Sequence, residues 1–184
     1  MKFSTRLFLC LAIPAVMFIA SLGNSVWGLV RTQSQFDTYI RTEQSIRTGL
    51  SEMYAQCLQM GHALRNMILD PANPKARENL TAALAAYDKA YANTAAIAKG
   101  TPFEAQIKLL PPLRAAQAQG QDKVITALEV DAASAIKTLN SAETPAWRAL
   151  KAELLKQSEI ARKLAATTHD SVDSGTSTAI TLSI

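Results

Sequence analysis

The most constraining feature of the sequence is an apolar run at residues 7–30, LFLCLAIPAVMFIASLGNSVWGLV. The run contains no charged residue, and Lys2, Arg6 and Arg31 flank it. At about 1.5 Å per residue, a helix of this length crosses a hydrocarbon core of roughly 30 Å, and Trp27 lies where an interfacial aromatic residue is expected. The run therefore predicts a transmembrane helix.

A cleaved signal peptide is the competing interpretation, because a basic start followed by an apolar stretch is typical of both segments. A signal core is normally shorter and ends at small residues in an A-x-A-like pattern, which FIASLGNS matches poorly. We favour the uncleaved anchor. The basic residues before it should then stay in the cytoplasm, with the chain after Arg31 in the periplasm of a bacterial inner membrane.

The end of the sequence, STAITLSI, becomes apolar again, and no charged residue follows Asp173. We interpret it as the entry into a second membrane helix, with an ordinary frayed C-terminus as the alternative. The expected organisation is a cytoplasmic N-terminus at 1–6, a transmembrane helix at 7–30, a periplasmic sensor domain at 31–175 and the start of a second transmembrane helix at 176–184.

The region between the anchors has helical spacing throughout, without alternating apolar runs or Asn-Gly and Asp-Gly hairpin turns. Four apolar stripes follow helical spacing, and the first of them steps by four and three residues throughout. They are Ile46, Leu50, Met53, Cys57, Met60, Leu64 and Met67; Leu80, Ala83, Tyr87, Ala90, Thr94 and Ile97; Phe103, Ile107, Leu110, Leu113, Val124 and Leu128; and Trp147, Leu150, Leu154, Ala161 and Leu164. The prediction is an all-α, antiparallel up-down four-helix bundle preceded by an N-terminal transmembrane helix.

Proline, glycine and asparagine mark the expected helix boundaries. The first helix should end at Asp70, because the residue before a proline is pushed out of the helical region. Asn73 and Pro74 suit the cap and first turn of the second helix. The remaining signals are Gly100 at the end of the second helix, Pro111-Pro112 kinking the third, a short helix at 132–139, and Thr144-Pro145 at the start of the fourth.

Composition and motifs argue against several functional classes. The formal charge of +4 is spread along the chain without a basic block, which gives nucleic-acid binding little support. The two cysteines, Cys10 and Cys57, form no CxxC or CxxCH motif and no disulfide framework. The two histidines, His62 and His169, accompany no nucleophile motif, phosphate loop or Glu-x-x-His pair, so we expect no enzyme, no metal and no cofactor.

Polar residues at the end of the first helix are the main ligand candidates. Positions three and four apart share a helix face, so a band beside the apolar stripe can be followed through Tyr54, Gln59, His62, Arg65 and Asn66. Arginine offers a rigid fork of donors for a carboxylate, and amides and a tyrosine hydroxyl can orient the rest of a small molecule.

Three further candidates lie on the later helices. Arg114 follows the expected kink, where a gap between helices would suit a carboxylate, and Arg148 lies beside Trp147 near the start of the fourth helix. Each candidate also has a structural interpretation. The arginines and His62 can be solvated surface residues, Trp147 a packing anchor, and Cys57 a small apolar core residue.

Two stretches, MYAQCLQMGHALRNMILDPANPKA and LNSAETPAWRALKAELL, are similar to segments of bacterial methyl-accepting chemotaxis receptors. With its anchor and four helices, the chain resembles the periplasmic four-helix-bundle sensor domain of these chemoreceptors over nearly its whole length. It departs from them at Cys57, where glycine is expected, and at His62, where glutamine is expected. The resemblance implies a homodimer, a membrane partner and signalling output from a cytoplasmic region.

The resulting hypothesis is a transmembrane chemotaxis receptor domain that recognises a small anionic molecule, such as an organic acid or an amino acid, and transmits a helix displacement. Three alternatives remain open at this point. They are a haem- or metal-binding helical bundle that uses His62, the sensor domain of a histidine kinase, and a membrane-anchored bundle that only binds other proteins.

Overall fold

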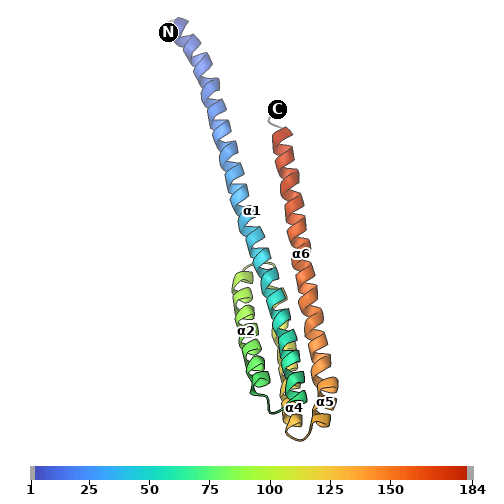
Figure 1. The fold of residues 1–184 in the computed structure, drawn as a ribbon. Helices are drawn as coiled ribbons and strands as arrows, with labels where there is room; N and C mark the ends of the chain where they lie inside the picture. Colours follow the sequence, from blue (N-terminus) through green and yellow to red (C-terminus); the bar gives the residue numbers. More distant parts are fainter. Residues whose placement is uncertain (1–2, 182–184) are drawn as a thin grey trace. The chain divides into compact units, whose positions relative to one another are not determined.

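The structure is a computed structural model that describes the backbone of residues 3–181 and the side chains of residues 12–28, 30, 33 and 41–164. Within residues 3–181 every regular element is helical and no strand occurs, so the all-α prediction is confirmed. The elements in order are α1 (Phe3–Leu69), α2 (Pro74–Ala98), α3 (Glu104–Ile107), α4 (Leu110–Leu128), α5 (Ala132–Thr138), η1 (Leu139–Glu143) and α6 (Thr144–Thr181) (Figure 1).

Contacts divide the chain into two units, Met1–Arg41 and Thr42–Ile184. Over the described residues, no helix combines the length and the apolar character that crossing a membrane requires. The transmembrane helix expected at 7–30 therefore stays a prediction. The entry into a second membrane helix at 176–184 also stays a prediction, because those side chains and the backbone of 182–184 lie outside the described residues.

The second unit contains the hydrophobic core. Every residue of the stripe predicted for the first helix is buried, and the helix ends at Leu69, directly before Asp70. The stripe of α2 is buried up to Thr94, but Ile97 is 39% exposed and the fully buried Ala98 takes its place. The prediction for Ile97 was wrong, because the last step along the stripe spans four residues rather than three. A period of 3.6 residues allows either step, so the spacing alone does not choose between them.

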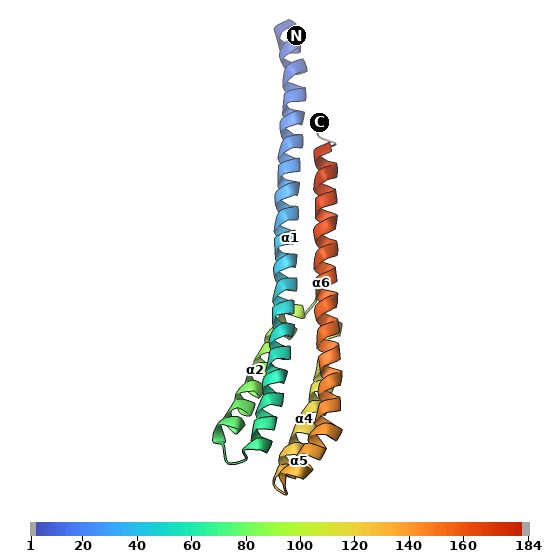
Figure 2. The same ribbon diagram turned by 45° about the vertical axis from the view of Figure 1, so that its right-hand side comes forward.

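The four long helices of this unit contact one another through named side chains. Gly49 of α1 meets Thr94 of α2, and Arg114 of α4 lies over the ring of Tyr87 of α2. Between α1 and α6, Tyr54 packs against Trp147, and α4 packs along α6. The second view shows α2 beside the neighbouring part of α1, and α4 beside α6 (Figure 2).

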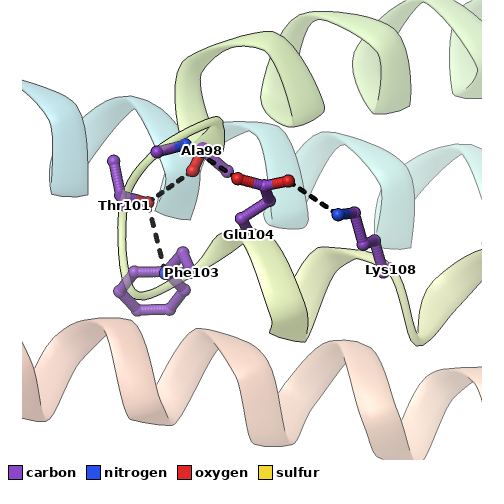
Figure 3. Close-up of polar contacts among 6 residues, drawn as sticks. Ala98, Thr101, Phe103, Glu104 and Lys108 are labelled. Carbon is purple, nitrogen blue, oxygen red and sulfur yellow. Dashed lines mark hydrogen bonds and ion pairs between the residues drawn. The ribbon is translucent and has the colours of Figure 1, made fainter.

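The turn after α2 is fixed by four polar contacts (Figure 3). Gly100 has φ +75°, which favours glycine, and its N–H donates to Glu104 Oε2 at 2.8 Å. The Thr101 hydroxyl donates to the Ala98 carbonyl at 2.6 Å and accepts from the Phe103 N–H at 3.2 Å, while Lys108 pairs with Glu104 at 2.6 Å. The predicted end of the second helix at Gly100 is confirmed.

The proline pair does not kink a continuous helix. The chain forms the short α3, leaves the helix at residues 108 and 109, and begins α4 at Leu110 with prolines in the first turn. The first turn of a helix leaves its N–H groups without intrahelical partners, so prolines cost nothing there. Pro111 and Pro112 therefore start a helix, and Arg114 contacts Gln117, Gln121 and the ring of Tyr87.

The predicted short helix at 132–139 corresponds to α5, which Asp131 caps by accepting the Ser134 N–H at 2.6 Å. Helical backbone then continues through η1, a π-helical turn closed by the Thr144 N–H donating to the Leu139 carbonyl. The helix α6 begins at Thr144, as predicted. The chain from α5 to α6 is thus one run of helix that contains a single wider turn.

Gly49 provides a test of the packing between α1 and α2. A Cβ at this position would lie 1.9 Å from Thr94 Oγ1, and Thr94 is itself only 1% exposed. We expect Gly49→Ala to lower the free energy of unfolding by about 1–3 kcal/mol, as overpacked cores do. Urea unfolding followed by circular dichroism measures this change.

Two comparisons make the test specific. Adding Thr94→Ala to Gly49→Ala should restore part of the lost stability, because it removes the clashing hydroxyl. Gly61→Ala is the control, since its Cβ would meet only the flexible end of Arg65 at 3.2 Å. An equal loss of stability in Gly61→Ala would show that helix glycines matter here for some other reason than close packing.

Candidate functional site

The apolar core is interrupted by a group of polar side chains from four elements, which we call the internal polar cluster. Its members are Cys57 of α1, Tyr87 of α2, Arg114, Gln117 and Gln121 of α4, and Glu143 of η1. Arg114 is half-buried, and each of the other members is at most 3% exposed. Buried polar groups are costly unless they are hydrogen-bonded, so the bonds within this cluster decide whether the core is stable.

Gln117 is the centre of these bonds. Its amide nitrogen donates to Glu143 Oε1 at 3.2 Å, and its oxygen accepts from Arg114 at 3.3 Å and from the Cys57 thiol at 3.8 Å. One fully buried amide thus connects a carboxyl group on η1 with a guanidinium on α4. The arrangement separates the two charges by a neutral group.

Arg114 and Gln121 complete the cluster. The second guanidinium nitrogen of Arg114 donates to Gln121 Oε1 at 3.1 Å, and the guanidinium carbon lies 5.5 Å from the centre of the Tyr87 ring. The Gln121 amide donates in turn to Met60 Sδ at 3.5 Å. Unlike the other polar groups of the cluster described above, the Tyr87 hydroxyl is buried without a hydrogen-bond partner among the described residues.

Burial changes the acid-base properties of the cluster. Desolvation raises the pKa of the Cys57 thiol to about 12, against a smaller lowering by Arg114, so this cysteine stays protonated and unreactive. The pKa of Tyr87 is raised for the same main reason. Desolvation also raises the pKa of Glu143, although the hydrogen bond from Gln117 and the charges of Arg65 and Arg114 oppose the rise.

The π-helical turn places Glu143 against α4. A Cβ on Gly120 would lie 2.8 Å from the Glu143 Cα, so the two backbones are in contact and only glycine allows this approach. Such turns insert one extra residue into a helix and are frequent at functional sites. The close contact holds the Glu143 carboxyl beside Gln117, one turn before Trp147.

A second polar feature lies at the edge between α1 and α6. The rings of Tyr54 and Trp147 are both half-buried, with centroids 5.8 Å apart and planes inclined by 36°. Arg65 is exposed on the same face of α1 as Tyr54, since eleven residues are close to three full turns. Its guanidinium lies beside Gly61, where a Cβ would be 3.2 Å from one of its nitrogens, and it has no ion pair among the described residues.

The structure therefore brings together only some of the predicted ligand residues. Tyr54 and Trp147 are in contact, whereas Gln59, His62, Asn66 and Arg148 are exposed and share in no described cluster. Gln59 and Asn66 lie roughly opposite the buried stripe of α1 rather than beside it. Within the described residues, no group of three histidine, cysteine or acidic side chains could hold a metal ion.

Sequence reasoning missed Gln117, Gln121 and Glu143. The signal was present, because Gln117 and Gln121 fill the gap between Leu113 and Val124 in the third apolar stripe. A polar residue at a position that the helical period assigns to the core is either misassigned or hydrogen-bonded inside. Gln117 and Gln121 are buried and hydrogen-bonded inside the domain.

These observations define a helical domain whose core carries an internal polar cluster and whose edge between α1 and α6 carries an aromatic pair, with an exposed guanidinium about three turns further along α1. A family model described as "Tar ligand binding domain homologue" matches residues 1–162. The chain belongs to this family. It is a family of helical sensor domains of chemoreceptors, periplasmic in membrane receptors, and not a family of enzymes.

The other two comparisons found no match. No curated protein sequence and no solved structure matches the chain. The assignment of the chain as a ligand-binding sensor domain of the chemoreceptor type thus rests on the family match alone.

Arg114 offers a test of the cluster. Arg114→Met keeps most of the volume but leaves Gln121 Oε1 without its donor and removes one donor from Gln117. An unsatisfied buried polar group costs about 1–3 kcal/mol, so we expect the free energy of unfolding to fall by about that amount. Lys123→Met on the same helix is exposed, and it should change stability by no more than about 0.5 kcal/mol. Equal effects of the two substitutions in urea unfolding would contradict a structural role for Arg114.

Proposed function

We propose that the chain is the external sensory domain of a transmembrane chemotaxis receptor and that it binds a small anionic molecule, an organic acid or an amino acid. The domain is an antiparallel up-down four-helix bundle in the periplasm, anchored in the inner membrane by residues 7–30 and by a second helix that begins at 176–184. The family match over residues 1–162 supports the receptor class.

The anionic ligand is inferred from one observation, the exposed guanidinium of Arg65. It has no ion pair among the described residues, and it shares a face of α1 with the half-buried Tyr54–Trp147 pair. A guanidinium suits a carboxylate because its donors form a rigid fork. Gln59, His62, Asn66 and Arg148 are proposed as further contacts, from the same chain or from its partner in a homodimer.

Arg114 remains a candidate contact of a different kind. Its donors are engaged by Gln117 and Gln121, so a ligand that reached it would have to replace these bonds. The exposed Arg65 has no such bonds to lose. We therefore place the main anion contact at Arg65 and assign Arg114 a supporting role.

Signalling follows from the position of the aromatic pair. Tyr54 belongs to α1 and Trp147 to α6, the two helices that we propose to enter the membrane. A ligand that binds more tightly to one arrangement of these helices shifts the population towards it. Displacements of helices by 1–2 Å are a common form of such transitions. No cofactor or nucleic acid takes part in this mechanism.

Replacing Arg65 tests the proposed site. A hydrogen bond to a charged group contributes about 1.5–3 kcal/mol, so Arg65→Ala should weaken binding of the acid by on the order of ten- to a hundredfold. The measurement is isothermal titration calorimetry against a panel of organic acids and amino acids, with the full chain in detergent micelles.

Arg77→Ala is the matched control, because Arg77 is an exposed arginine on α2. It should bind the acid as the unchanged protein does. Undiminished affinity in Arg65→Ala would remove Arg65 from the site. An equal loss in both variants would point to a general effect of positive charge rather than to a binding site.

A further inference from the structure

The internal polar cluster contains a carboxyl group that ligand recognition at Arg65 does not require. Glu143 is 2% exposed, and its one hydrogen bond in the described structure comes from the neutral amide of Gln117. No cation lies within ion-pair distance of it among the described residues. A charged carboxylate in such a place is poorly compensated, whereas a neutral carboxyl group fits it well.

The backbone around Glu143 has a second arrangement available. The residue ends the π-helical turn η1, which contains one residue more than an α-helical turn would. If the wide turn moved along the helix by one residue, the side chain that it passed would rotate by about 100° around the helix axis. Such a rotation at Glu143 would carry its side chain away from α4. The contact between Gly120 and the Glu143 backbone opposes this movement in the packing observed.

We propose that η1 and Glu143 form a proton-dependent switch that controls the packing of α6 against α4. With a proton bound, Glu143 stays in the core and the turn is held against Gly120. Without the proton, the carboxylate favours an opened turn in which it reaches water. The change is transmitted along α6 to Trp147, one turn later, and thus to the contact with Tyr54 on α1.

The direction of the pH effect follows from proton linkage. The ordinary pKa of the carboxyl group is 4.5, and desolvation raises it in the packed arrangement. The packed arrangement therefore binds the proton more tightly, is most stable below the ordinary pKa, and loses stability as the pH rises through the raised value. The groups facing Glu143 that also carry or can carry charge are Arg65 and Cys57 of α1 and Arg114 of α4.

The test compares amide hydrogen exchange of residues 139–147 in the full chain, in detergent micelles without ligand, at an acidic and a neutral pH. Glu143→Gln imitates the protonated side chain and can still accept the hydrogen bond from Gln117. At neutral pH the segment should exchange severalfold faster in the unchanged protein than in Glu143→Gln. At acidic pH the two rates should coincide, because Glu143 is then protonated.

Two further variants make the result decisive. Glu129→Gln, an exposed carboxyl group that follows α4, should behave as the unchanged protein at both pH values. Arg65→Gln removes a positive charge that favours the carboxylate form, so the pH at which exchange changes should rise. Since Arg65 is exposed, this variant still decides the matter if Glu143→Gln fails to fold.

Three outcomes would overturn the proposal. They are equal exchange in the unchanged protein and Glu143→Gln at neutral pH, a difference between them that persists at acidic pH, and an unchanged midpoint in Arg65→Gln. Because no ligand is present in the experiment, its result is independent of whether an acid binds at Arg65.

Discussion

The buried amide of Gln117 is the interaction on which the polar interior of this helical domain depends. A carboxyl group and a guanidinium both reach the core, and neither can stay there without hydrogen bonds. Gln117 bonds to both, because an amide is donor and acceptor at once, and it accepts the Cys57 thiol as well. Three segments that are far apart in the chain are therefore held in one register by a single side chain.

Apolar side chains alone would not fix that register so strictly. Leucine and methionine pack well at several relative heights of two helices, whereas a hydrogen bond is lost when the helices slide by one turn. The close contacts at Gly49 and Gly120 act in the same direction, since each admits the neighbouring helix at one position only. The packing of the helices is thus tightly determined around α4 and η1, where the π-helical turn lies.

A sensor needs both rigidity and an alternative packing. The family match assigns the chain to ligand-binding sensor domains, and the internal polar cluster ends at Glu143 of η1, which directly precedes α6. Arg65 on α1 offers an exposed guanidinium, the edge between α1 and α6 offers two half-buried aromatic rings, and the interior offers a carboxyl group whose pKa burial raises. The guanidinium suits recognition, and the carboxyl group suits a change of state.

The sequence by itself determined the all-α class, the end of α1, the start of α2 and α6, and the buried stripe from Ile46 to Met67, because helical period, caps and proline act over a few residues. Only the tertiary structure decided that Gln117 meets Glu143, that Tyr54 meets Trp147, and that Pro111 and Pro112 begin a helix instead of kinking one. These outcomes depend on the relative height and rotation of helices that are distant in the chain. Periodicity says which face of a helix is buried, but the packing of all the helices together decides which residues meet there.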